Sequence, residues 1–167
     1  DVTIGTMTIG TDAEIVTGTF DAQSTITGSL TIGANANIQA SAFAGATLTG
    51  NFTIDPTWTL VQDSLDGMNV IGDLIVPNNE VLPISVFSGG SITGDLTIPI
   101  STVFTGNQHF YGSNIGTVNI PDNFVLVDGM FYNVTVNTMT LGNNITVPNL
   151  TCITGIITNM TVGDNLV

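Results

Sequence analysis

The chain has 167 residues, 43% of them hydrophobic, with thirteen acidic residues, one His and no Lys or Arg, so its formal net charge is −13 at pH 7. Nucleic-acid binding and electrostatic docking to anionic lipid both depend on Lys or Arg, and this composition excludes them. The apolar content is too high for a disordered acidic polymer, and no apolar run of about 18 residues predicts membrane insertion.

An apolar pair, two residues apart, recurs about every 22 residues along the chain. In chain order the pairs are Met7 and Ile9, Leu30 and Ile32, Phe52 and Ile54, Leu74 and Val76, Leu96 and Ile98, Val118 and Ile120, Met139 and Leu141, and Met160 and Val162. The steps are 23, then 22 four times, then 21 twice. Around each pair, apolar and polar residues alternate before a turn at Gly, Pro or Asn, which is typical of short β-strands.

Short strands of this kind cannot bury an inner face alone, so successive copies must stack. The sequence therefore predicts an all-β fold, a parallel β-solenoid (β-helix) of about 7.5 coils that forms one domain over residues 1–167. Eight repeats with these steps make up the domain, and the last repeat is incomplete. The pattern resembles single-stranded parallel β-helices as a class, and we assign no specific family from it.

Thr residues lie between or just before the paired apolar residues, where they are expected to point outward. They are Thr6, Thr8, Thr31, Thr53, Thr97, Thr138, Thr140 and Thr161. The resulting T-x-T rows resemble the Thr arrays of hyperactive antifreeze proteins, which implies ice binding as one hypothesis. Thr is also simply a favourable exposed β residue.

Asp73 and Asp95 occupy equivalent positions in adjacent copies, so stacking is expected to place their Cα atoms about 4.8 Å apart. Two such carboxylates are a weak candidate site for Ca²⁺, and the alternative is two solvated acids on an outer face. No other cofactor is expected. β-Helices of similar period include pectin-degrading enzymes, but their basic catalytic residues have no counterpart here, and we assign no catalytic residue.

Two single residues break the pattern of the columns. His109 falls at a position that other copies fill with apolar residues, and we expect a bulge over residues 105–108 that places Phe110 in the core and pushes His109 outward. A metal or catalytic role for His109 is the alternative. Cys152 is expected to be a buried small apolar residue, or else an exposed residue that forms an intermolecular disulfide.

Asn-x-Thr sequons suit an exported glycoprotein, although a chain rich in Asn and Thr also produces such triplets by chance. The possible glycosylation sites are Asn51, Asn133, Asn144, Asn149 and Asn159. The chain begins at Asp1 without Met, and we expect a processed chain or an excised segment.

The terminal copies lack the charged or irregular segments that usually cap a solenoid. We therefore expect either a piece of a longer solenoid or end-to-end assembly into a head-to-tail homopolymer. The residues expected at that contact are Asp1, Val2, Ile4, Met160, Val162, Leu166 and Val167. The leading hypothesis is a structural subunit of an extracellular filament or of a cell or virion surface appendage. A surface-recognition module is the alternative, and a carbohydrate-active enzyme is third.

Overall fold

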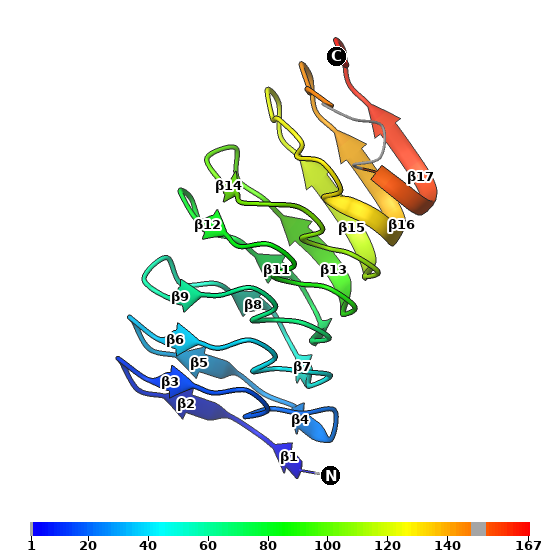
Figure 1. The fold of residues 1–167 in the computed structure, drawn as a ribbon. Helices are drawn as coiled ribbons and strands as arrows, with labels where there is room; N and C mark the ends of the chain where they lie inside the picture. Colours follow the sequence, from blue (N-terminus) through cyan, green and yellow to red (C-terminus); the bar gives the residue numbers. More distant parts are fainter. Residues whose placement is uncertain (1, 148–152) are drawn as a thin grey trace.

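The computed structural model describes residues 2–147 and 153–167. They form a parallel β-solenoid of about seven turns, without a helix in the described part of the chain (Figure 1). The all-β solenoid and its repeat of about 22 residues per turn are thereby confirmed. Within the described ranges, no helix is long and apolar enough to span a membrane.

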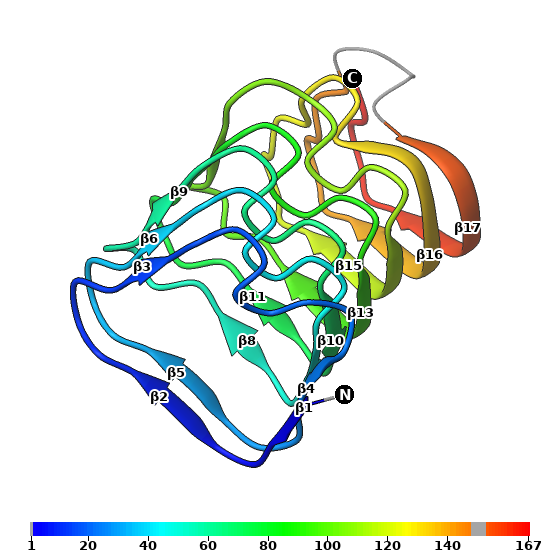
Figure 2. The ribbon, with the colours of Figure 1, turned by 60° about the horizontal axis from the view of Figure 1, so that its bottom comes forward.

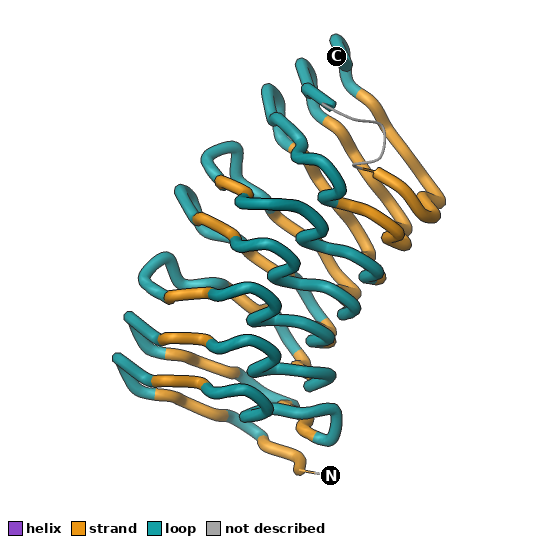
Figure 3. The backbone as a smooth tube through the Cα atoms, viewed as in Figure 1, coloured by secondary structure: helices purple, strands orange, loops and turns teal. Residues whose placement is uncertain are grey.

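The strands are short in the first coils and long in the last ones (Figure 3). They are β1 Val2–Ile4, β2 Met7–Ile9, β3 Glu14–Ile15, β4 Ser24–Ile26, β5 Leu30–Ile32, β6 Asn37–Ile38, β7 Thr47–Thr49, β8 Phe52–Thr53, β9 Thr59–Leu60, β10 Asn69–Ile71, β11 Leu74–Ile75, β12 Val81–Leu82, β13 Ser91–Thr97, β14 Val103–Phe104, β15 Asn114–Ile120, β16 Phe131–Leu141 and β17 Ile153–Val162.

Each coil passes through three walls, which Figure 2 shows from near the coil axis. In the first coil, the first wall contains β1, the second β2 and the third β3. The first and second walls contribute a 10-stranded sheet in the order β1-β4-β7-β10-β13-β15-β16-β17, with β8 and β11 beside this path. We call it the main sheet. The third wall contains β3-β6-β9 and β12-β14, whereas β2 and β5 form a separate pair. All these pairings are parallel, as stacking of successive coils requires.

The strands become long from β13 onward, where the corner between the first two walls also changes. The register shifts between Ile92 and Asp95, because the corner Thr93-Gly94 of β13 faces Gly116 alone in β15. β13 keeps both corner residues and already runs through the corner as one strand, and β15 does so with one residue fewer. β16 and β17 continue in this way, with 11 and 10 residues.

The core consists of the inward columns that the repeat predicts. The inward side chains of the middle coils are almost completely buried, and aromatic rings continue the stack between coils. Phe20 stacks on Phe43 at 4.9 Å between ring centroids, and Phe110 stacks on Phe131 at 5.4 Å. Such pairs add about 0.5–1.5 kcal/mol to the burial of apolar area.

The turn that follows the second wall repeats a left-handed backbone conformation. The φ angles of Asn35, Asn79, Asn123, Asn144 and Asn165 lie between 55° and 61°. Asn tolerates this conformation better than other non-Gly residues, because its side chain can bond locally. Here the side chains also bond between coils, since Asn144 Nδ2 donates to Asn123 Oδ1 at 3.0 Å and Asn165 Nδ2 to Asn144 Oδ1 at 2.9 Å.

Candidate functional site

Uncharged polar side chains form a cluster on the outer face of the main sheet in its C-terminal half. They surround a hollow of about 390 Å³ beside Gly116. The polar residues that line it are Ser91, Thr93, Asn114, Thr135, Asn137 and Thr158. We call this set the neutral patch. Its members are in register across strands, since Ser91 pairs with Asn114 and Asn114 with Thr135.

Two exposed tyrosines lie near residues of the neutral patch in the chain. Tyr111 and Tyr132 lie three residues before Asn114 and Thr135, respectively. Their rings stack at 5.8 Å between centroids with an interplanar angle of 10°, although the two residues are 40% and 41% exposed. Sequence reasoning missed this pair. The available signal was the spacing of the two tyrosines in the chain, which equals the step between the anchor pairs of the same two copies.

The Thr rows predicted from the sequence lie on the second wall and form a discontinuous column. Thr8 pairs with Thr31, and Thr140 pairs with Thr161. Between these ends Ile75 and Asn119 pair with Thr97, and no strand pairing joins β5 to β8, so Thr31 and Thr53 belong to different sheets. Thr6, Thr8, Thr31, Thr53, Thr97 and Thr161 are exposed, while Thr138 and Thr140 are half-buried.

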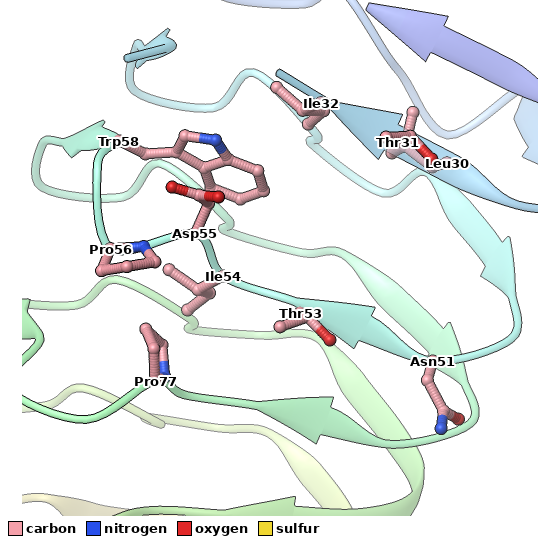
Figure 4. Close-up of a pocket in the computed structure, with 10 residues that line it drawn as sticks. All are labelled: Leu30, Thr31, Ile32, Asn51, Thr53, Ile54, Asp55, Pro56, Trp58 and Pro77. Carbon is pink, nitrogen blue, oxygen red and sulfur yellow. The ribbon is translucent and has the colours of Figure 1, made fainter. Parts of the chain in front are cut away.

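A second hollow, of about 370 Å³, lies where the second wall opens between β5 and β8 (Figure 4). Figure 4 shows the indole of Trp58 reaching toward Ile32 of the preceding coil, with Asp55 and Pro56 nearby. The Trp58 Nε1 atom donates a hydrogen bond of 3.0 Å to the carbonyl oxygen of Gly33. The repeat gave no sign of this opening. The step from Leu30 to Phe52, across the opening, is 22 residues, and so is the step from Phe52 to Leu74, where the second wall is closed.

The Asp73 and Asp95 carboxylates take part in a ladder of side-chain to main-chain hydrogen bonds. The Asp73 N–H donates to Asn51 Oδ1 at 3.0 Å, and the Asp95 N–H donates to Asp73 Oδ1 at 2.9 Å. In the described ranges no group of three or more His, Cys, Asp or Glu side chains could hold a metal ion. A Ca²⁺ site at this pair stays a prediction, and the hydrogen bonds give Asp73 a structural role.

The expectation for His109 was half right. Phe110 does occupy the aromatic column, because the Phe87 N–H bonds to the His109 carbonyl and the Phe110 N–H to the Met130 carbonyl. His109 is not pushed outward, however, and its side chain is fully buried. This coil has one added residue before His109 and Phe110. His109 therefore falls in the neighbouring inward column, which contains Val86 and Met130 in the adjacent coils. Burial lowers the pKa of His109, and the backbone of Pro83, which the ring hydrogen-bonds, opposes this shift together with the backbone of Gly106.

The apolar columns are open at both ends of the described stack. Met160 and Val162 are 48% and 45% exposed, although their strand partners Met139 and Leu141 in the preceding coil are buried. At this end Leu166 and Val167 are also exposed, and at the other end Val2 is exposed while Ile4 is partly buried. Asp1, Cys152 and the sequon residue Asn149 lie outside the described residues. The other sequon residues, Asn51, Asn133, Asn144 and Asn159, are exposed.

The family model of the BspA-type leucine-rich repeat region, with six copies, matches residues 13–136 and 68–162. The chain belongs to this family. Repeats of this type indicate a surface or recognition module and are generally non-enzymatic, and proteins that carry them are typically surface-located or secreted. Comparisons with curated proteins and with solved structures gave no match.

Proposed function

We propose that this chain is a recognition module that binds a neutral, hydroxyl-rich glycan through the neutral patch and the Tyr111–Tyr132 stack. The observation that carries this proposal is an exposed, stacked pair of rings in the two coils that, three residues further on, place the hydroxyl and amide side chains of Asn114 and Thr135 in register. Sugar rings have an apolar face that packs on aromatic rings and hydroxyls that exchange hydrogen bonds with Ser, Thr and Asn.

The charge of the chain supports a neutral ligand. With thirteen acidic residues and no Lys or Arg, the net charge of the chain opposes the binding of polyanions. The neutral patch itself contains no ionisable side chain. A flat row of short side chains on a β-sheet also suits a linear polymer, since neighbouring strands repeat the same groups about every 4.8 Å.

The experiment is retention on immobilised neutral glucans, mannans and galactans, with polygalacturonate as the anionic comparison. We expect retention on at least one neutral polymer and none on the polyanion. The double variant Tyr111→Ala/Tyr132→Ala is expected to bind about tenfold more weakly, because each ring contributes about 0.5–1.5 kcal/mol. The matched control is Thr59→Ala/Val103→Ala, which alters exposed residues on the third wall. Equal binding by both double variants, or no retention on any neutral polymer, would overturn the proposal.

End-to-end assembly into a filament is the second candidate function, and the open apolar columns favour it. Continuing the columns from one copy to the next places Ile157 over Ile4, Met160 over Met7 and Val162 over Ile9. These contacts would cover apolar positions that are buried in the middle coils. The filament would present the neutral patch repeatedly along its side, so the two candidate functions are compatible.

Ice binding by the Thr rows is a third proposal and has less support. The in-register pairs Thr8–Thr31 and Thr140–Thr161 favour it, whereas the opening between β5 and β8 divides the face. Thermal hysteresis in the wild-type chain, lost in Thr97→Leu/Thr161→Leu, would support it. Hysteresis that is absent, or is unchanged in the double variant, would contradict it.

A further inference from the structure

The second wall is open between β5 and β8, while the walls on both sides of it stay closed. In the first wall β4 pairs with β7, and in the third wall β6 pairs with β9. In the second wall β5 pairs only with β2, and β8 only with β11. A Cβ built on Gly50 would have no heavy atom within 4 Å, whereas one on Gly28 or Gly72 would collide with the preceding coil. We call this opening the slot.

Main-chain groups of β5 and of β8, the two strands that border the slot, face into it. The Phe52 and Ile54 N–H groups donate to the Asp73 and Ile75 carbonyls of the following coil, so the main-chain groups of Thr53, which alternate with them, face β5. On the other side, the Met7 N–H donates to Ser29 O and the Gly33 N–H to Ile9 O, which leaves the groups of Leu30 and Ile32 facing β8. Buried or half-buried main-chain groups favour a hydrogen-bonding partner, and an extended backbone provides donors and acceptors on both of its edges.

Trp58 accounts for the opening. Trp58 follows Ala13 and Ala36 in one inward column of the third wall. The coils that contain the two alanines are joined in the second wall, where β2 pairs with β5. The indole is much larger than a methyl group and extends back to the Gly33 carbonyl, where its Nε1 atom donates at 3.0 Å. It therefore occupies space between the coils and prevents β5 from pairing with β8. Ile32 and Ile54 line the slot with apolar side chains.

Asp55 supplies a fixed negative charge where β8 ends. Its Oδ1 atom accepts hydrogen bonds from the Thr57 N–H at 2.9 Å and the Thr57 hydroxyl. These bonds lower the pKa of Asp55, so its carboxylate is charged at neutral pH. A cationic side chain would complement it. The chain has no Lys or Arg, so a second copy could not supply such a side chain.

We propose that the slot binds a short extended strand of a partner protein, parallel to β5 and β8, with alternating apolar residues and a Lys or Arg at its C-terminal end. The apolar side chains would face Ile32, Ile54 and Trp58, and the cation would meet Asp55. This surface is on the second wall and does not depend on the proposed glycan site. The partner strand would complete the second wall between β5 and β8.

Trp58 is the single Trp of the chain, so its fluorescence reports on the slot directly. The probe is acetyl-Val-Thr-Val-Thr-Lys-amide, titrated into the full chain. We expect a saturable change in Trp58 emission. The same peptide with N-methylated backbone amides should bind at least about tenfold more weakly, because it lacks the N–H donors. Equal binding of both peptides, or no binding of the first, would overturn the proposal. A change in Trp58 emission with protein concentration alone would instead identify a second copy as the occupant and would also overturn it.

Two variants separate the slot from general effects on folding. Trp58→Ala should allow β5 to pair with β8 and should abolish binding measured by calorimetry, with the circular dichroism spectrum retained. If this variant fails to fold, Asp55→Asn decides, since Asn can still accept the Thr57 hydrogen bonds. Asp55→Asn should weaken binding of the Lys peptide several-fold. A peptide that ends in Gln instead of Lys should bind more weakly to the wild-type chain, and Asp55→Asn should leave its binding unchanged. Equal losses for both peptides would contradict the proposed charge contact.

Discussion

The Nδ1 atom of His109 donates a hydrogen bond of 2.9 Å to the carbonyl oxygen of Pro83, one coil earlier. Since a carbonyl only accepts, Nδ1 must carry a proton, and the neutral ring then leaves Nε2 as an acceptor. Nε2 is buried and has no hydrogen-bond partner among residues 2–147 and 153–167. The neutral ring is thus held inside the core next to Phe104, whose ring centroid lies 4.7 Å from that of His109.

This arrangement predicts acid sensitivity at His109. Because burial lowers its folded-state pKa below the ordinary value of 6.5, the unfolded chain binds the proton first as the pH falls. The stability that the neutral ring contributes is therefore present above about pH 6.5 and is lost progressively below it. We expect His109→Met, which copies Met130 in the next coil, to remove this component. Urea unfolding of both proteins at about pH 7.5 and 5.5 measures it, and an equal stability difference at the two pH values would contradict the prediction.

Glu80 predicts an effect of opposite sign. It is buried, and desolvation, followed by repulsion from Asp55, raises its pKa. The stability linked to its protonated form is fully present below the unfolded pKa of about 4.5 and is lost as the pH rises through the folded pKa. Glu80→Gln should therefore raise the melting temperature at pH 7 and have little effect near pH 4. The control is Glu14→Gln, at an exposed acid, for which we expect no comparable rise at pH 7.

The adjacent residues Phe110 and Tyr111 test the register of the coil that contains His109. Phe110 is buried and stacks on Phe131, so Phe110→Ala should lower the free energy of unfolding by about 3–5 kcal/mol. Tyr111 is exposed, so Tyr111→Ala should lower the free energy of unfolding by about 1 kcal/mol or less. Chemical denaturation measures both values. A reversed order would mean that the aromatic column runs through a different residue.

The open ends predict concentration-dependent association of the isolated chain. Met160→Glu places a charge in the apolar column at the C-terminal end and should shift sedimentation toward the monomer. Val103→Glu is the matched control, because Val103 is 52% exposed on β14 in the middle of the stack. A strictly monomeric wild-type chain at high concentration would exclude end-to-end assembly, and equal effects of the two variants would place the contact elsewhere.

The stacked core could be predicted from the sequence because each anchor pair, such as Leu96 and Ile98, repeats both the residue type and the spacing. The position of His109 could not. An added residue before Phe110 and the residue missing at the next corner cancel, so the step from Leu96 to Val118 is the ordinary step of the repeat. Between these two changes, every column is displaced by one position from the regular repeat.

The candidate sites were harder to predict than the core, since they depend on departures from the repeat. The slot results from the volume of Trp58 at a position that Ala13 and Ala36 fill in earlier coils, and no spacing reveals it. The Tyr111–Tyr132 stack lies in a column where the earlier coils have Asp21, Ala44, Asp66 and Ser88. The Thr rows were predicted in the right columns, but their division between Thr31 and Thr53 follows from the slot.

The most direct test of recognition by the neutral patch is amide chemical-shift mapping of this 17.3 kDa chain while a neutral glycan oligomer is added. We predict that the largest shifts fall on Tyr111, Asn114, Tyr132 and Thr135, with smaller ones on Thr93 and Asn137. Saturating shifts confined to the third wall, at β9 and β14, or no shift with any oligomer of a neutral polymer that retains the protein, would contradict this prediction.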